Sequence, residues 1–183
     1  MCMSATWNVP SVSSTRAKVI ITLLGSSIAD GADAEDAYEL GKRIGAAAHV
    51  LKNGGYGGTM AASARGCREA GGHVIGVGIE GHKIDRTGAP NPYNSEVIVK
   101  ANALERVAEM LRCDLVIVLP GHVGTLHELF AAWVSAIEGH LPSIMLVGPK
   151  LKALLEYLTE NGFLKEEHTE HVSVFDSVGE LTI

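Results

Sequence analysis

Cysteine is scarce in this chain, and its spacing argues against the metal and redox sites that paired cysteines build. The three cysteines are Cys2, Cys67 and Cys113, and no two of them form a Cys-x-x-Cys pair. An odd number of cysteines without such a pair is typical of a reducing compartment, so we expect a cytoplasmic protein. Cys67 and Cys113 lie among apolar residues, which favours buried, unreactive thiols over nucleophiles.

Long apolar runs and an excess of basic residues are also missing. The formal net charge is −6 and no stripe of Lys and Arg is present, which argues against a partner with a nucleic-acid backbone. The apolar runs are too short to cross a bilayer, so we expect no membrane partner. Residues 1–17 lack an apolar signal-peptide core and are rich in Ser and Thr, which predicts a flexible N-terminal tail.

What the chain does contain is an alternation of apolar segments with segments of helical period. The predicted strands are residues 18–24, 50–51, 73–77, 96–99, 115–119, 143–147 and 172–175, and the predicted helices are 34–48, 60–70, 101–112, 125–138 and 150–161. Such alternation is typical of an α/β protein with a doubly wound parallel sheet, and 183 residues suit a single domain. Lys52 and Asn53 weigh against the second strand, and residues 78–94 predict a surface loop.

Three polar or glycine-rich turns follow predicted strands. They are Gly25-Ser26-Ser27, Gly54 to Thr59, and Pro120 to Gly124. Because the carboxyl ends of parallel strands share one edge of a sheet, we expect the three turns to lie together there, where ligands bind. The third turn leads into a helix, whose free N–H groups and positive dipole end suit a phosphate. Thr125 adds a hydroxyl, and Glu128 adds a carboxylate about one helical turn further on.

Each candidate residue also has a purely structural interpretation. The turns Gly54 to Thr59 and Pro120 to Gly124 contain neither Gly-x-Gly-x-x-Gly nor a Gly-Lys followed by Ser or Thr. They therefore match neither the dinucleotide-binding motif nor the P-loop motif. Gly54 to Thr59 is as often a packing turn as a ligand loop, and Ser26 or Ser27 can cap a turn. Arg106 on an amphipathic helix would ordinarily be a solvated charge, and Glu128 would favour the first turn of its helix through the dipole alone.

No metal or cofactor site is predicted. His122, His127 and Glu128 match no common zinc pattern. The lysines that a pyridoxal phosphate Schiff base would require also lack a recognisable context; those considered are Lys52, Lys83 and Lys100. The expected partner is therefore a small phosphorylated molecule that binds without a cofactor.

Several motifs resemble the Lonely Guy (LOG) family of cytokinin-activating phosphoribohydrolases, often labelled lysine decarboxylase-like. Gly25-Ser26-Ser27 resembles the opening turn of the family, and Gly54 to Met60 resembles its second glycine-rich turn. Arg106 lies where the family has an arginine before its signature strand. Pro120 to Glu128 resembles the signature itself, Pro-Gly-Gly-x-Gly-Thr-x-x-Glu. The resemblance extends from about residue 18 to residue 147.

The resemblance implies a Rossmann-like nucleotide-binding domain over residues 18–183, usually in a homodimer. It implies hydrolysis of the bond between the base and ribose 5-phosphate of a nucleoside 5′-monophosphate, with N6-modified AMP of the cytokinin type as a candidate substrate. Glu128 and Arg106 would be catalytic, because a carboxylate stabilises an oxocarbenium-like transition state and an arginine forks onto phosphate or ribose oxygens. Carried onto this chain, the phosphate-binding residues are Gly121, His122, Val123, Gly124 and Thr125, and the other substrate-binding residues are Gly25, Ser26, Ser27, Gly57, Gly58 and Thr59.

Two residues depart from the family pattern. His122 replaces the second glycine of the signature, and histidine is tolerated less well than glycine if that position requires a positive φ. Val107 replaces the lysine that usually follows the arginine, which removes one positive charge. Both departures motivate an alternative, a non-catalytic carrier or sensor for a nucleotide or the molybdenum cofactor, as in carrier proteins of the same superfamily. Phe130 and Trp133 predict core or dimer contacts rather than a base-stacking platform.

Overall fold

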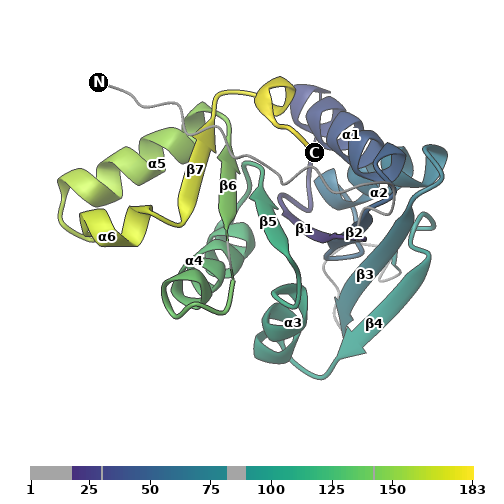
Figure 1. Cartoon of the computed structure of the whole chain (residues 1–183). Helices are drawn as coiled ribbons and strands as arrows, with labels where there is room; N and C mark the ends of the chain where they lie inside the picture. The colour runs from purple at the N-terminus through teal and green to yellow at the C-terminus, as the bar shows by residue number, and fades with distance from the viewer. Residues whose placement is uncertain (1–17, 30, 82–89, 142) are drawn as a thin grey trace.

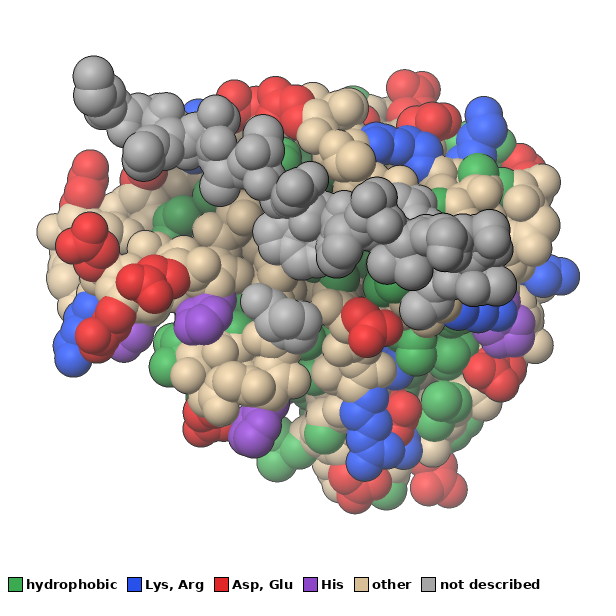
Figure 2. Space-filling view, in the orientation of Figure 1, with side chains coloured by type: hydrophobic (Ala, Val, Ile, Leu, Met, Phe, Trp, Pro, Cys, Tyr) green, Lys and Arg blue, Asp and Glu red, His purple; other side chains and the backbone are tan. Residues whose placement is uncertain are grey.

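The computed structural model describes residues 18–29, 31–81, 90–141 and 143–183. The predicted N-terminal tail (1–17) and residues 82–89 of the predicted loop at 78–94 lie outside the described residues, and residues 78–79 of that loop belong to a strand. Acidic and basic side chains are interspersed on the face shown in Figure 2. Within the described chain, no helix has the length and apolar character needed to cross a membrane.

A parallel sheet of seven strands forms the centre of the described chain (Figure 1). Its strands are β1 (Ile20–Leu24), β2 (Val50–Asn53), β3 (His73–Ile79), β4 (Glu96–Lys100), β5 (Leu115–Val118), β6 (Ile144–Val147) and β7 (Val172–Phe175). The order β4-β3-β2-β1-β5-β6-β7 reverses direction between β1 and β5, and every pairing is parallel. The predicted α/β class with a doubly wound parallel sheet is confirmed, and the reversal marks the place where such sheets bind ligands.

Helices cover both faces of the sheet. They are α1 (Gly31–Ala46), α2 (Thr59–Glu69), α3 (Ala103–Met110), α4 (Val123–Ile137), α5 (Pro149–Glu160) and the short α6 (Glu166–Thr169), followed by the 3₁₀ turn η1 (Val178–Glu180). One core cluster joins the sheet to α1, α2 and η1, and the other joins it to α3, α4 and α5. Alternate strand residues serve the two layers, as in β5, where Ile117 packs in the first cluster and Val118 in the second.

The elements α6 and η1 were not predicted, because a single helical turn carries no apolar period. Helix α3 is shorter than the predicted 101–112. It begins after Asn102, whose side chain accepts a hydrogen bond from the N–H of Glu105 at 3.0 Å and so caps the helix. Trp133 is buried in the core and donates its indole N–H to the carbonyl of His168 at 2.7 Å, whereas its neighbour Phe130 is 39% exposed.

The end of β2 differs most from expectation. Lys52 and Asn53, which weighed against a strand, are both paired in the sheet and almost fully buried, at 3% and 0% exposure. Their polar atoms are satisfied internally: Lys52 donates to carbonyl oxygens near the end of α3, and Asn53 donates to the carbonyl of Met60 at 2.9 Å. Burial of these residues is therefore compatible with a central strand.

Candidate functional site

The three turns after β1, β2 and β5 lie together at the carboxyl edge of the sheet, as predicted. The carbonyl of Ser26 accepts hydrogen bonds from both the N–H and the hydroxyl of Thr59, each at 3.0 Å. The hydroxyl of Thr125 donates to the carbonyl of Gly25 at 2.8 Å. These bonds join the first turn to the second and to the third. They also occupy the donor hydrogens of Thr59 and the hydroxyl hydrogen of Thr125, so their predicted contacts with a ligand would use other atoms.

Two glycines permit this close approach. Gly58 has φ +61°, and a Cβ atom there would lie 2.7 Å from the backbone nitrogen of Ile28. A Cβ atom at Gly121 would lie 3.1 Å from the carbonyl carbon of Gly25 and would overlap the hydroxyl of Thr125. A side chain at either position would push the turns apart.

The third turn places the start of α4 two residues earlier than predicted. His122 is the N-cap residue, and its carbonyl accepts the first bond of the helix, from the N–H of Leu126 at 3.1 Å. Its φ of −99° is extended, so the position does not require a positive φ and the condition under which histidine would be strained is not met. Its imidazole Nδ1 lies 3.1 Å from the hydroxyl oxygen of Ser26, which also accepts from the N–H of Ile28. Histidine is accommodated here without a positive φ, and its ring is held against the first turn.

The N-terminus of α4 has unpaired N–H groups. Val123, Gly124 and Thr125 form its first turn, where no carbonyl of the helix itself can accept a bond. No described residue accepts from these three groups or from the N–H groups of Gly121 and His122. Gly121 to Gly124 are exposed, whereas Thr125 is buried. These donors and the positive helix end form a cradle that suits an anion.

Arg106 and Glu128 form an ion pair beside this cradle. The guanidinium Nη1 lies 2.6 Å from the carboxylate Oε1, and the Nε–H donates to the carbonyl of Val77 at 2.7 Å. The two residues are 9% and 7% exposed. Arg106 is therefore not a solvated charge. Glu128, the sixth residue of a helix that starts at Val123, lies beyond the first turn, so a dipole effect does not explain it.

Burial controls the electrostatics of this pair. Removal from water raises the pKa of the Glu128 carboxyl, and the charge and hydrogen bond of Arg106 oppose that rise. No described group bonds the second carboxylate oxygen, Oε2. Arg106 thus holds the carboxylate at Oε1, and Oε2 can accept a hydrogen bond from a water molecule or a sugar hydroxyl.

Sequence reasoning missed Gly54 and Asn53, which support the pair from the second turn. A Cβ atom at Gly54 would overlap the Nη2 of Arg106 and lie 2.5 Å from the sulfur of Met60. The Asn53 carboxamide accepts from the N–H of Gly55 at 2.9 Å and so fixes this turn. The available signal was a pair of polar residues in a buried strand directly before a glycine-rich turn.

Gly57 and Ser27, which were also predicted to bind substrate, are neighbours. A Cβ atom at Gly57 would lie 3.3 Å from the carbonyl oxygen of Ser27, so the two residues that were predicted to contact substrate lie side by side. Val107 is buried. Among the described residues, no three His, Cys, Asp or Glu side chains are grouped so that they could hold a metal ion.

The fold and site define a Rossmann-like α/β protein with an anion cradle beside a buried Arg–Glu pair. Residues 18–170 match the SLOG cluster4 family, and the chain belongs to this family. It is 36% identical over 152 residues to a Mycobacterium tuberculosis protein named cytokinin riboside 5′-monophosphate phosphoribohydrolase, covering 76% of this chain and 80% of the relative. A protein of the same name from Arabidopsis thaliana is 35% identical over 124 residues, covering 64% of this chain and 54% of the relative.

Similar solved structures support the fold. The molybdenum cofactor binding protein of Rippkaea orientalis superposes with a TM-score of 0.69 at 23% identity, covering 90% of this chain and 93% of that protein. The molybdenum cofactor carrier protein of Chlamydomonas reinhardtii superposes with a TM-score of 0.66 at 22% identity, covering 89% and 92%. At these identities the likeness establishes a shared architecture and leaves the ligand to be argued from the site.

Proposed function

We propose that this protein is a phosphoribohydrolase that cleaves the N-glycosidic bond of a nucleoside 5′-monophosphate. The products are a free base and ribose 5-phosphate, and N6-modified AMP of the cytokinin type is the candidate substrate. The observation that carries the proposal is the buried 2.6 Å pair of Arg106 and Glu128 beside the unpaired N–H groups of α4. The names of the relatives at 36% and 35% identity support it.

In the proposed reaction the 5′-phosphate binds the N–H groups of Gly121 to Thr125. This contact fixes the ribose near the carboxylate of Glu128. The oxygen of water adds to the anomeric carbon as the bond to the base breaks, the bonding electrons leave with the base, and the proton released by the water ends on that base. The Glu128 carboxylate stabilises the positive charge that develops on the sugar, and Arg106 holds that carboxylate in place.

The test is direct product analysis. Purified protein is incubated with AMP, N6-isopentenyl-AMP and the other common nucleoside monophosphates, and free base and ribose 5-phosphate are followed by chromatography. Release of equal amounts of both from at least one nucleotide is expected. Tight nucleotide binding without release of base from any member of the panel would overturn the proposal in favour of the carrier or sensor. The extended φ of His122 removes the argument from backbone strain at that position, whereas the loss of a positive charge at Val107 still motivates that alternative.

The pH dependence of hydrolysis follows from the carboxyl group of Glu128. We expect kcat/KM to fall on the acid side with a midpoint above 4.5, the ordinary pKa of a glutamate carboxyl. Burial raises this pKa, and the ionised form stabilises the transition state, so activity is present above the raised pKa and is lost as pH falls through it. Initial rates at low substrate concentration between pH 4 and pH 8, in buffers of constant ionic strength, measure the midpoint. Full activity down to a pH below 4.5 would contradict the assignment.

We also propose that the protein is a homodimer that packs through α4. Exposed apolar side chains recur along one face of this helix, at Val123, Phe130, Val134 and Ile137. Val134→Glu should convert a dimer into a monomer because it buries a charge at the centre of this face. Phe163→Glu, which changes an exposed aromatic residue after α5, is the matched control and should leave the dimer intact. Light scattering coupled to gel filtration measures the mass, and a monomeric parent protein would refute the proposal.

We further propose a cytoplasmic location. Cys67 and Cys113 are free thiols, and burial raises the pKa of the Cys67 thiol to about 11. Burial also raises the pKa of Cys113. Such protonated thiols are unreactive and suit a reducing compartment. Fractionation of cells that express the full chain, with compartment markers, tests the location.

A further inference from the structure

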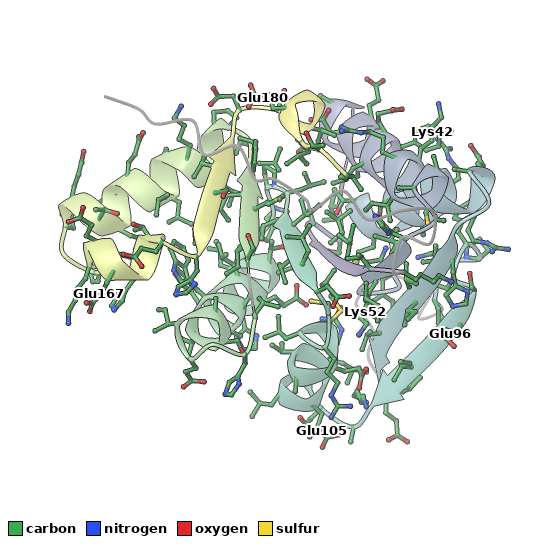
Figure 3. All side chains as sticks on the ribbon, in the orientation of Figure 1. Lys42, Lys52, Glu96, Glu105, Glu167 and Glu180 are labelled. Carbon is green, nitrogen blue, oxygen red and sulfur yellow. The ribbon has the colours of Figure 1, made fainter. Side chains whose placement is uncertain are left out.

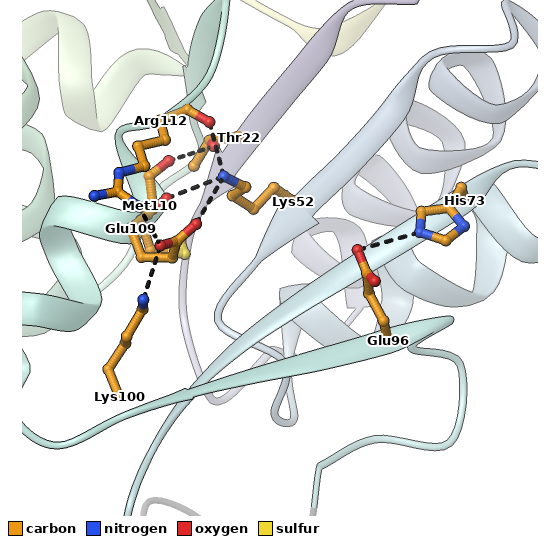
Figure 4. Close-up of polar contacts among 8 residues, drawn as sticks. All are labelled: Thr22, Lys52, His73, Glu96, Lys100, Glu109, Met110 and Arg112. Atoms are coloured by element: carbon orange, nitrogen blue, oxygen red, sulfur yellow. Dashed lines mark hydrogen bonds and ion pairs between the residues drawn. The ribbon is translucent and has the colours of Figure 1, made fainter.

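A buried lysine at the end of β2 contacts the last turn of α3. Lys52 lies between the sheet and α3, whereas Lys42 and Glu105 lie at the periphery (Figure 3). Its Nζ donates to the carbonyl of Glu109 at 3.0 Å and to the carbonyl of Arg112 at 2.7 Å (Figure 4). Lysine at a helix C-terminus satisfies carbonyls that have no partner within the helix and complements the negative dipole end.

The neighbouring strand makes the same kind of contact. Thr22 in β1 is the register partner of Lys52 in β2 and is fully buried. Its hydroxyl donates to the carbonyl of Met110 at 2.7 Å. Two adjacent strands therefore direct three hydrogen bonds to the carbonyls at one end of α3, as Figure 4 shows.

The carboxylate of Glu109 balances the charge and adds a third attachment. It lies 3.7 Å from the Nζ of Lys52 and 2.9 Å from the Nζ of Lys100 at the end of β4, and Arg112 contributes a further contact at 3.1 Å. The hydrogen bond from Lys100 is the main cause that lowers the pKa of Glu109, so the carboxylate is ionised. Burial lowers the pKa of Lys52, and the charge of Glu109 opposes that shift.

Glu109, where these contacts converge, lies three residues after Arg106 on the same helix. Helix α3 has 8 residues, which is about two turns, so its position depends on its attachments rather than on its own length. Arg106 and Glu109 share its buried face. On the opposite face of β2, Asn53 fixes the glycine turn whose Gly54 lies against the guanidinium of Arg106. Lys52 thus holds helix α3, which carries Arg106, and the next residue, Asn53, holds the glycine turn that contacts Arg106.

We propose that Lys52, assisted by Thr22 and Glu109, is a positioning residue that sets Arg106 against Glu128. The effect on the rate of hydrolysis rests on the proposed function, whereas the effect on the position of Arg106 does not. The lysine acts through the last turn of α3 and contacts no substrate. Its loss would let the helix shift and would displace the guanidinium from the carboxylate. Displacements of about 1 Å at a catalytic group can reduce a rate by about a hundredfold.

The kinetic experiment uses Lys52→Met, which keeps the length of the side chain and removes its donors. We expect kcat to fall by about 10- to 100-fold while KM changes by less than about threefold, because the phosphate cradle on α4 is untouched. In an Arg106→Lys background the same change should cost less than about threefold, because residues that act through one group are not additive. Leu151→Ala, which opens a cavity under α5, is the control for destabilisation alone and should leave kcat unchanged.

A second readout does not depend on activity. The Nε–H of Arg106 donates to the carbonyl of Val77 and is buried, so it should exchange slowly with solvent in ¹⁵N NMR spectra. We expect at least about a tenfold faster exchange in Lys52→Met, a smaller change in the isosteric Thr22→Val, and none in Leu151→Ala. Thr22→Val also provides the test if Lys52→Met fails to fold.

The outcomes separate the two proposals. An inactive parent protein would refute the hydrolase, and the exchange rates would still test Lys52. Unchanged Arg106 exchange in both anchor variants would refute the positioning role, as would kinetic losses that are fully additive with Arg106→Lys. Equal acceleration of exchange in Leu151→Ala would mean that Lys52 only stabilises the fold and would also overturn the proposal.

Discussion

Replacing Glu128 by glutamine is expected to lower kcat for nucleotide hydrolysis by about 10²- to 10³-fold. The amide has the size of the carboxylate but lacks the charge that stabilises the developing cation on the ribose. Binding of the ground-state nucleotide should change by less than about threefold, because the phosphate is held by main-chain N–H groups. Product chromatography gives kcat, and isothermal titration calorimetry gives Kd.

The same helix supplies the control for this experiment. Glu138 is the exposed C-cap residue of α4, and Glu138→Gln removes the same charge far from the cradle. Its kcat should equal that of the parent protein. If Glu128→Gln retains full activity, or loses nucleotide binding in proportion to activity, then Glu128 is not the group that stabilises the transition state.

Replacing Arg106 by methionine is expected to lower the free energy of unfolding by about 3–5 kcal/mol and to abolish hydrolysis. Removal of the guanidinium leaves the carboxylate of Glu128, 7% exposed, without its partner. Urea denaturation followed by circular dichroism measures the loss. Arg65→Met, which breaks a pair with Glu69 in which both side chains are about half exposed, is the control and should cost less than about 1 kcal/mol.

A second substitution distinguishes loss of the ion pair from loss of packing. In Arg106→Met with Glu128→Gln the buried charge is gone, so much of the stability should return while hydrolysis stays absent. A double variant as unstable as Arg106→Met alone would show that the arginine acts through its packing and through its bond to Val77. Arg106 would then have no demonstrated electrostatic role in the site.

The parts of the fold that follow from local periodicity were predictable. The apolar run at 115–118 and the amphipathic segment after it gave β5 and α4, and glycine-rich turns at the ends of three strands indicated one shared edge. That inference needs only parallel topology, because parallel strands present their carboxyl ends together. The same inference places the cradle at the N-terminus of α4 and brings Ser26, Thr59 and Thr125 to one place.

Properties that depend on tertiary contacts were not predictable. Lys52 weighed against a strand because its polar partners, in the last turn of α3 and just beyond it, are 57 and 60 residues away along the chain. The ion pair joins residues 22 positions apart, and no spacing rule relates them. The conformation of His122 was left open because it depends on where the next helix begins, and that helix begins at Val123, two residues earlier than the pattern indicated.

The lack of room at Gly54 has a consequence for comparing members of this fold. Arg106 is tied at its Nε and Nη1 atoms, so it cannot swing aside for even a methyl group at residue 54. A homologue with any larger amino acid at this place must carry its arginine elsewhere or lack one. The amino acid at the position of Gly54 therefore distinguishes relatives that retain the arginine–glutamate ion pair from relatives that lack it.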